Sequence, residues 1–235
     1  MFLDPNSLQE NLPRLEGIEK GTIRYVAQAM ANFREEAATI FKSEQDLAGD
    51  IGEDITREAL DRVGVSKIEE RLFGKVDYKR ARYIFNNEYA VRQALFVDSK
   101  AEKADGTATI QTTQTSMRIR HIRAGREVEE FGTLPNVLKT SKGLYLVSTV
   151  FVHYSYRFER NRNTLEKIIV AGVPNGMLRD IYNPTFEDTI WRTGRNAPSR
   201  GEEFRVRLVF DKLKAKKKWR VQEIPMAPEE FVWDE

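Results

Sequence analysis

The sequence predicts one α/β or α+β domain, in which helices come first and a mixed central sheet flanked by them follows. Residues 12–64 repeat apolar side chains at helical spacing. Beyond Glu70 the chain changes to short runs that are rich in β-branched and aromatic residues. The 235 residues, 40% of them apolar, suffice for one core that needs no disulfide or metal to fold.

The composition excludes several classes of function. There is no cysteine, so thiol catalysis, zinc–cysteine sites and disulfide frameworks are excluded, and two histidines are too few for a His-rich metal cluster. The net charge is only +2, so a nucleic-acid partner can be indicated only by local clusters of charge. No stretch approaches the roughly 18 apolar residues of a membrane span, and a signal-peptide pattern is missing. We therefore expect a cytoplasmic protein without membrane contact.

The amino-terminal part predicts two helices. Apolar residues at helical spacing from Leu15 to Phe41 predict one long helix that faces the core. A loop is expected at Asp46–Asp50, followed by a second amphipathic helix over residues 53–63. Two acids, Glu53 and Asp54, stand at its start. Capping and the helix dipole explain them, although either could supply a carboxylate to a site.

The remainder predicts a sheet. The run at 144–158 is the strongest strand signal and is expected to form a central strand, with His153 as a core residue. Residues 104–114 are polar and predict a loop or an exposed strand, and a basic run occupies 212–220. Further strands are expected at 71–84, 92–100, 165–178, 204–213 and 219–224.

The triplet Asp98-Ser99-Lys100 at the end of a predicted strand indicates a catalytic site. Side chains alternate along a strand, so Asp98 and Lys100 share a face and Ser99 points away. Asp77 on the preceding strand could approach Asp98 across a hairpin, and two carboxylates with waters suit Mg²⁺. Such an ion can stabilise charge on a phosphodiester and acidify a bound water. A surface salt bridge is the alternative, because acid–x–lysine triplets also arise by chance.

A second cluster, in residues 193–210, could read DNA bases. Arg205 and Arg207 lie on one face of a predicted strand, and Arg195 and Asn196 precede them in a loop. The planar fork of arginine matches guanine O6 and N7, and asparagine can bind a base edge. A solvated strand face explains the same arginines without any ligand.

Three basic residues are candidates for phosphate contacts. They are Arg200 in the loop and Lys212 and Lys214 in the basic run. Such contacts give affinity and salt dependence without sequence information. A solvated basic loop is the alternative interpretation.

Seven blocks of the chain carry a further signal when they are taken together and in order. They are EKGTIRYVAQAM, EDITREAL, FGKVDYKRARY, LFVDSKA, STVFVHYSYR, APSRGEEFRVRLVFDKLK and WRVQEI. Separate blocks in the same order are more specific than any one motif. Over about residues 15–224 they resemble the SfiI-like family of type II restriction endonucleases and, more distantly, BglI.

The resemblance implies the PD-(D/E)xK nuclease fold in a single nuclease domain spanning 1–235, with a helical part at about 12–64 and a catalytic and DNA-reading core at about 71–224. By position, Asp77 and Asp98 are the metal-binding acids, Lys100 lies beside the attacking water, and the backbone carbonyl of Ser99 also binds the metal. Val76 stands where the motif's proline would be.

The resemblance also implies the reaction and the partners. It implies Mg²⁺-dependent hydrolysis of double-stranded DNA at an interrupted palindrome, which leaves 3′ overhangs. The arginines favour G·C-rich half-sites. A palindrome needs two copies of the chain, so a homodimer is the minimum and a tetramer is possible. Two alternatives remain open, namely a non-specific or repair nuclease with the same core and a catalytically idle DNA-binding module.

Overall fold

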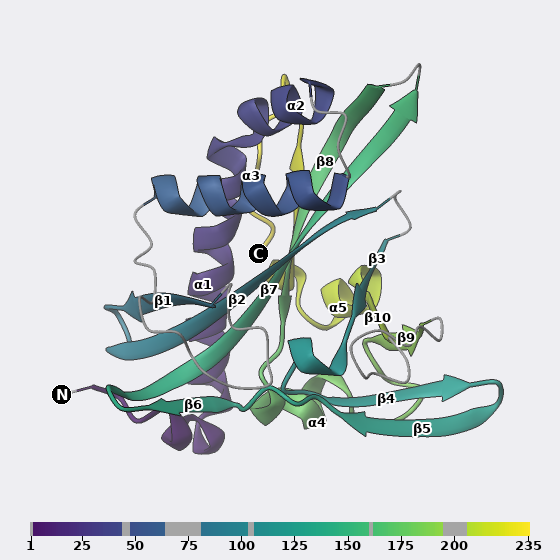
Figure 1. Cartoon of the computed structure of the whole chain (residues 1–235). Coiled ribbons are helices and arrows are strands. Elements are labelled where there is room, and N and C mark those ends of the chain that lie inside the picture. The colour runs from purple at the N-terminus through teal and green to yellow at the C-terminus, as the bar shows by residue number, and fades with distance from the viewer. Residues whose placement is uncertain (1, 44–47, 64–80, 103–105, 160–161, 195–205) are drawn as a thin grey trace.

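The computed structural model describes residues 2–43, 48–63, 81–102, 106–159, 162–194 and 206–235. Three helices cover one side of a long twisted sheet, and two small sheets lie toward its other side (Figure 1). Within the described ranges, no helix is long and apolar enough to cross a membrane. The α-helices are α1 (Leu12–Asn32), α2 (Arg34–Ser43), α3 (Ala48–Arg62), α4 (Arg179–Tyr182) and α5 (Phe210–Lys216), and the 3₁₀ helices are η1 (Pro5–Glu10), η3 (Thr112–Gln114), η4 (Gly176–Leu178) and η5 (Lys218–Arg220).

The central sheet is mixed, as predicted. Its order is β1-β2-β7-β8-β11, and β6 also pairs with β7. The pair β2–β7 is parallel and the other pairs are antiparallel. The predicted central strand at 144–158 is confirmed, because β7 lies between β2 and β8. The strands are β1 (Ala81–Asn86), β2 (Val91–Glu102), β6 (Val137–Thr140), β7 (Gly143–Glu159), β8 (Arg162–Val173) and β11 (Val221–Pro225).

Two smaller sheets complete the fold. A three-stranded antiparallel sheet has the order β3-β10-β9, and β4 and β5 form a hairpin that extends beyond β9 (Figure 1). The 118–123 strand was not predicted from the sequence. These strands are β3 (Thr107–Ile110), β4 (Arg118–Arg123), β5 (Arg126–Phe131), β9 (Trp191–Thr193) and β10 (Val206–Val209).

Alternation along β7 separates two apolar cores. Val150, Val152 and Tyr154 pack with residues of α1, α2 and α3. Phe151 packs in a second cluster with residues of β3, β9 and β10. His153 follows on that second side, where it is buried and its ring meets Phe210 edge-on at 5.6 Å. The prediction that His153 is a core residue is confirmed, and the two faces of the sheet have different neighbours.

The predicted long helix from Leu15 to Phe41 is corrected, because it is interrupted at Phe33. Phe33 has φ −103° and ψ 3°, and its amide donates to Met30 O at 3.2 Å in a tightened last turn of α1. The Phe33 side chain is buried in the core. Neither glycine nor proline marks the break, so the apolar pattern could not reveal it.

Two other boundaries are corrected. Helix α3 begins at Ala48, so Asp50, predicted in a loop, lies in the first turn of the helix. Among the described residues of 204–213, strand β10 ends at Val209, and the basic run continues as helix α5. Phe210 and Leu213 are both buried, and their helical spacing explains why this basic run is a helix.

Candidate active site

Strand β2 presents Asp98 and Lys100 on one face, as the alternation predicted. Lys100 Nζ lies 2.8 Å from Asp98 Oδ2, and the two side chains are 27% and 13% exposed. In the parallel register Asp98 pairs with Phe151 and Lys100 with His153. Both side chains therefore point to the side of the small sheets, away from α3. An acid and an ammonium fixed together and still reachable from solvent are suited to act on a bound substrate.

Ser99 points to the other face, where it fixes helix α3 to strand β2. Its hydroxyl donates to Thr56 Oγ1 at 2.8 Å. The Thr56 hydroxyl donates to Gly52 O at 2.9 Å, so the Tyr154 hydroxyl, 2.6 Å away, donates to Thr56 as well. Burial raises the pKa of Tyr154, which keeps this hydroxyl neutral. The network holds the backbone of Ser99 between Asp98 and Lys100.

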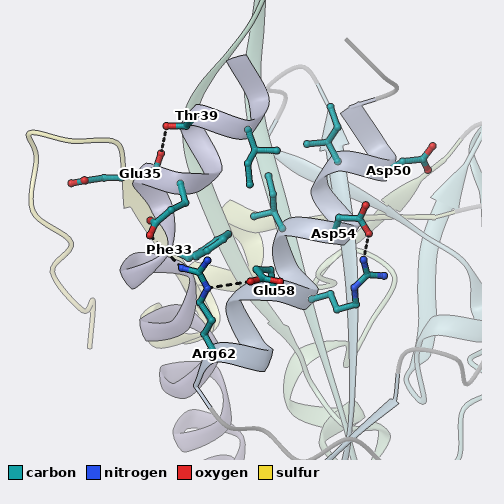
Figure 2. A pocket seen from close by; sticks show the side chains of 12 residues that line it. Phe33, Glu35, Thr39, Asp50, Asp54, Glu58 and Arg62 are labelled. Atoms are coloured by element: carbon teal, nitrogen blue, oxygen red, sulfur yellow. Dashed lines mark hydrogen bonds and ion pairs between the residues drawn. The ribbon is translucent and has the colours of Figure 1, made fainter. Parts of the chain in front are cut away.

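Helix α3 separates the two candidates for a third carboxylate. Residues two apart on a helix point to nearly opposite sides, whereas residues three apart share a side. Asp54, two residues before Thr56, therefore points away from β2, and it is exposed and paired with Arg57 at 2.6 Å (Figure 2). Glu53, three residues before Thr56, is half-buried on the side that faces the sheet. Of the two acids, Glu53 therefore faces the sheet, on the Ser99 side of β2, and Asp54 faces solvent.

The groove between α2 and α3 is not a second candidate for DNA binding. It has a volume of about 780 Å³, and Figure 2 shows Glu35, Asp50, Asp54 and Glu58 along it. Arg62 crosses it from α3 to pair with Glu36 of α2 at 3.4 Å, and it also pairs with Glu58 on its own helix at 3.2 Å. Carboxylates outnumber the basic residues of its lining, and an acidic surface repels a phosphate backbone.

The described residues supply some of the oxygen ligands that a hard divalent ion needs. Asp98 supplies carboxylate oxygens of the kind that Mg²⁺ prefers, and the Ser99 carbonyl adjoins it. Within the ranges that the structure describes, no group of three or more acidic or histidine side chains could hold a metal. Asp77, the other predicted ligand, lies outside those ranges. The β1–β2 hairpin that was expected to carry it is present, with Ala81 opposite Phe96.

Of the two arginines on the predicted base-reading strand, Arg207 lies within the described residues, on β10. Its Nε donates to Thr107 Oγ1 on β3 at 2.6 Å, which fixes the guanidinium on the face of the small sheet opposite to Leu208. Leu208 next to it is buried in the core. Arg192 on β9 pairs directly with Arg207 across the strands, so both arginines share a face. Sequence reasoning missed Arg192, because no periodic pattern surrounds it.

The other predicted DNA-contacting residues divide into two groups. Arg195, Asn196, Arg200 and Arg205 lie outside the described residues. Lys212 and Lys214 lie on α5, where Lys212 is exposed and Lys214 pairs with Asp234 at 3.0 Å. Lys212 therefore remains the better candidate for a phosphate contact.

Gln114 on η3 is a site residue that the sequence did not indicate. Its Nε2 donates to Asp98 Oδ1 at 3.1 Å, so the carboxylate is held on one oxygen by Gln114 and on the other by Lys100. The sequence predicts a loop or an exposed strand over residues 104–114, and the structure corrects this, because β3 there is mostly buried. Their polar composition was the single available signal, and it does not select one glutamine.

His121 joins the β4–β5 hairpin to the sheet that carries Arg207. The Thr193 hydroxyl donates to Ile122 O at 2.8 Å, so it accepts a hydrogen bond from His121 Nδ1 at 2.9 Å. The ring is 1% exposed, and its burial, aided by the nearby charge of Arg123, lowers the pKa of His121. The neutral ring is therefore part of the folded structure.

This pKa predicts a loss of stability in acid. Because the pKa of folded His121 lies below its ordinary value of 6.5, the unfolded chain binds the proton more readily. The stabilisation is present above that ordinary value and is lost as the pH falls through it. We expect His121→Asn to reduce the fall in unfolding free energy between about pH 7.5 and about pH 5.5, measured by urea denaturation. An unchanged pH dependence in the variant would contradict this role.

The mixed sheet, the helices on one face and the acid–x–lysine strand define the class of PD-(D/E)xK nucleases. Residues 14–224 match the family described as the type II restriction enzyme SfiI. The SfiI enzyme of Streptomyces fimbriatus is 34% identical over 229 aligned residues, which cover 91% of this chain and 85% of the relative. The chain therefore belongs to the SfiI family and is a type II restriction endonuclease.

Two solved structures have the same fold. Tetrameric SfiI bound to cognate DNA superposes with a TM-score of 0.83 at 31% identity, covering 98% of this chain and 91% of that one. BglI bound to its DNA recognition sequence superposes with a TM-score of 0.77 at 16% identity, covering 95% and 94%. These matches confirm the predicted fold class.

Proposed function

We propose that this protein hydrolyses double-stranded DNA at a specific, interrupted palindromic and G·C-rich site, that it requires Mg²⁺, and that it leaves 3′ overhangs. One observation carries the proposal. Asp98 and Lys100 face the same side of the central sheet as the small sheet that bears Arg207 and Arg192. A duplex on that side would meet the acid–lysine pair and the arginines together.

The proposed roles follow from the positions of the side chains. Asp98 and Asp77, with the carbonyl of Ser99, would hold the ion. When bound, Mg²⁺ supplies charge stabilisation to the phosphodiester and a more acidic water. Lys100, held 2.8 Å from Asp98, orients the attacking water with its ammonium. Glu53, the sheet-facing acid of α3, is the proposed source of an additional carboxylate, and it would approach β2 from the Ser99 side.

The proposed DNA contacts combine base reading with phosphate binding. Arg207 and Arg205 would read guanines, and Arg195 and Asn196 would read neighbouring bases. Lys212, exposed on α5, would bind a phosphate, and Arg200 would do the same from its loop. Arg192 joins the base-reading group because it lies beside Arg207 on the same face.

We propose a homo-oligomer of at least two copies that acts in the cytoplasm. A palindromic site presents two identical half-sites, and a two-fold axis places one copy of the chain on each. The solved SfiI structure is a tetramer bound to cognate DNA, which favours the larger assembly for this chain too. Analytical ultracentrifugation with and without DNA would distinguish the dimer from the tetramer.

The test is to incubate the purified protein with a long DNA of known sequence and Mg²⁺, separate the products and sequence their ends. We expect discrete fragments whose ends give the site, the spacer and the overhang. A smear of products would instead favour a non-specific nuclease. DNA that is bound but uncut would favour the idle DNA-binding module.

Replacing Arg207 with alanine tests base reading. We expect binding to the mapped site to weaken by about 1–3 kcal/mol, with little change on unrelated DNA, because a bidentate arginine–guanine contact is lost. Fluorescence anisotropy with the two duplexes measures both affinities. Lys212→Ala is the control, since loss of a phosphate contact weakens binding to both duplexes alike. If Arg207→Ala lost affinity equally for the mapped site and for unrelated DNA, Arg207 would be a phosphate contact instead of a base-reading residue.

A further inference from the structure

One short segment, 107–114, connects the proposed base-reading strand to the catalytic carboxylate. At its start Thr107 Oγ1 accepts the hydrogen bond of Arg207 Nε at 2.6 Å. At its end Gln114 Nε2 donates to Asp98 Oδ1 at 3.1 Å. The segment consists of β3, one linking residue and η3. Two side chains with different proposed tasks, one in recognition and one in chemistry, are thus bound to the same piece of backbone.

The amide of Gln114 has only one orientation that satisfies its neighbours. Its Oε1 accepts from the backbone N–H of Gln111 at 2.9 Å, and the backbone N–H of Gln114 donates to Gln111 O at 2.9 Å. The amide oxygen therefore faces Gln111, so the amide NH₂ must face Asp98. Rotating the amide would break both side-chain bonds. The hold on Asp98 consequently depends on the exact position of η3.

The segment 107–114 is packed firmly against β10, so we expect its residues to shift together. Ala108 and Ile110 are fully buried in the same cluster as Val206 and Leu208 of β10. The carbonyl of Thr112 accepts the backbone N–H of Thr133 at 2.8 Å. A close-packed strand transmits a displacement instead of absorbing it.

We propose that Gln114 is a positioning residue that couples base recognition at Arg207 to metal binding at Asp98. This inference rests on the function proposed above. Asp98 Oδ1 is held by Gln114 and Oδ2 is paired with Lys100, so a cation must share or replace one of these partners. A shift of β3, made when Arg207 binds a base, alters the hold of Gln114 on Asp98. Cognate DNA thereby tightens metal binding, and by reciprocity the metal tightens binding to cognate DNA.

The test measures the affinity for Ca²⁺ by isothermal titration calorimetry, with the duplex that carries the mapped site and with a scrambled duplex. Electrophoresis after each titration verifies that the DNA is intact. The ratio of the two Ca²⁺ affinities is the coupling, expected to be about ten-fold or more for the wild type. A residue with a merely structural role would change both affinities and leave their ratio alone.

The informative variants are Gln114→Met, which keeps the length of the side chain, and Thr107→Val, which keeps its shape. We expect each single variant to bring the ratio of the two Ca²⁺ affinities close to one. The double variant should bring the ratio no lower, because both substitutions break the same path between Arg207 and Asp98. Thr107→Ser, which keeps the hydroxyl, is expected to restore the ratio. Gln28→Met is the matched control, since Gln28 bonds only to Asn32 on the exposed side of α1, at 2.8 Å, among its described contacts.

Three results would overturn the coupling. They are a wild-type ratio of one, an unchanged ratio in Gln114→Met, and independent effects of Gln114→Met and Thr107→Val. Thermal unfolding shows whether each variant is folded. If Gln114→Met does not fold, Gln114→Glu serves as a second probe, because it keeps the hydrogen bond from the Gln111 amide. Gln114→Glu is likewise expected to bring the ratio close to one. Discrete cleavage by the wild type together with any of these results would leave the proposed function intact and remove only the coupling.

Discussion

Asp98→Asn is expected to slow DNA cleavage at least about a thousand-fold while DNA binding is retained. The charge stabilisation that a bound metal provides is worth several kcal/mol, and each 1.36 kcal/mol is about ten-fold in rate. Asparagine keeps an oxygen that can accept the hydrogen bond of Gln114 but loses the charge that pairs with Lys100 and attracts the ion. Single-turnover cleavage of the mapped site, beside anisotropy without metal, separates the two effects.

Asp211→Asn is the matched control for this substitution. Asp211 is exposed in the first turn of α5, so the same loss of charge there should leave the cleavage rate unchanged. Binding of metal-free DNA by Asp98→Asn should be unchanged or slightly tighter, because a negative charge facing the phosphates is removed. Cleavage by Asp98→Asn within ten-fold of the wild-type rate would contradict the assignment of Asp98 as the metal ligand.

Strand β2 could be predicted because its signals are local. The apolar run before Asp98 identified a buried strand, and alternation then placed Asp98 and Lys100 together with Ser99 opposite. The central position of β7 was likewise evident, because a long run that reaches no charged residue before Arg157 has to be covered on both faces. The order of the blocks identified the family, which no single motif could do.

Contacts between distant segments could not be predicted. Gln114 reaches Asp98 only because the fold brings η3 to β2, and Arg192 reaches the face of Arg207 only through the pairing of β9 with β10. The interruption of the first helix at Phe33 is also set by tertiary packing. Pairings of this kind depend on topology, and a polar residue whose partner is far along the chain looks like any other surface residue.

The same limit applies to a buried ion pair that the sequence did not indicate. Glu19 on α1 and Arg220 on η5 meet through Oε2 and Nη2 at 2.6 Å, and both side chains are almost completely buried. Glu19 Oε1 also accepts the backbone N–H of Asn175 at 2.8 Å. The guanidinium lies 4.3 Å from the ring centroid of Tyr182 and 4.4 Å from that of Trp219. The pair thus joins α1 to the last strand of the sheet.

Arg220→Met is therefore expected to lower the free energy of unfolding by about 3–5 kcal/mol, because it leaves the Glu19 charge buried without a partner. Arg57→Met is the matched control, since it breaks the exposed pair with Asp54 and should cost less than about 1 kcal/mol. Urea denaturation followed by circular dichroism measures both. A loss in Arg220→Met no larger than that in Arg57→Met would contradict the expected role of the buried pair.

The pH dependence and a double variant identify the cause of the loss. Burial is the main influence on the Glu19 carboxyl and raises its pKa, whereas the charge of Arg220 lowers it. Removal of Arg220 is therefore expected to raise the pKa of Glu19 further. A folded pKa above the unfolded value favours the folded state at low pH and loses that contribution as the pH rises. The cost of Arg220→Met should thus be smaller at about pH 5 than at about pH 8. Glu19→Gln in the same chain should recover much of the loss, because glutamine still accepts from Asn175 and carries no charge.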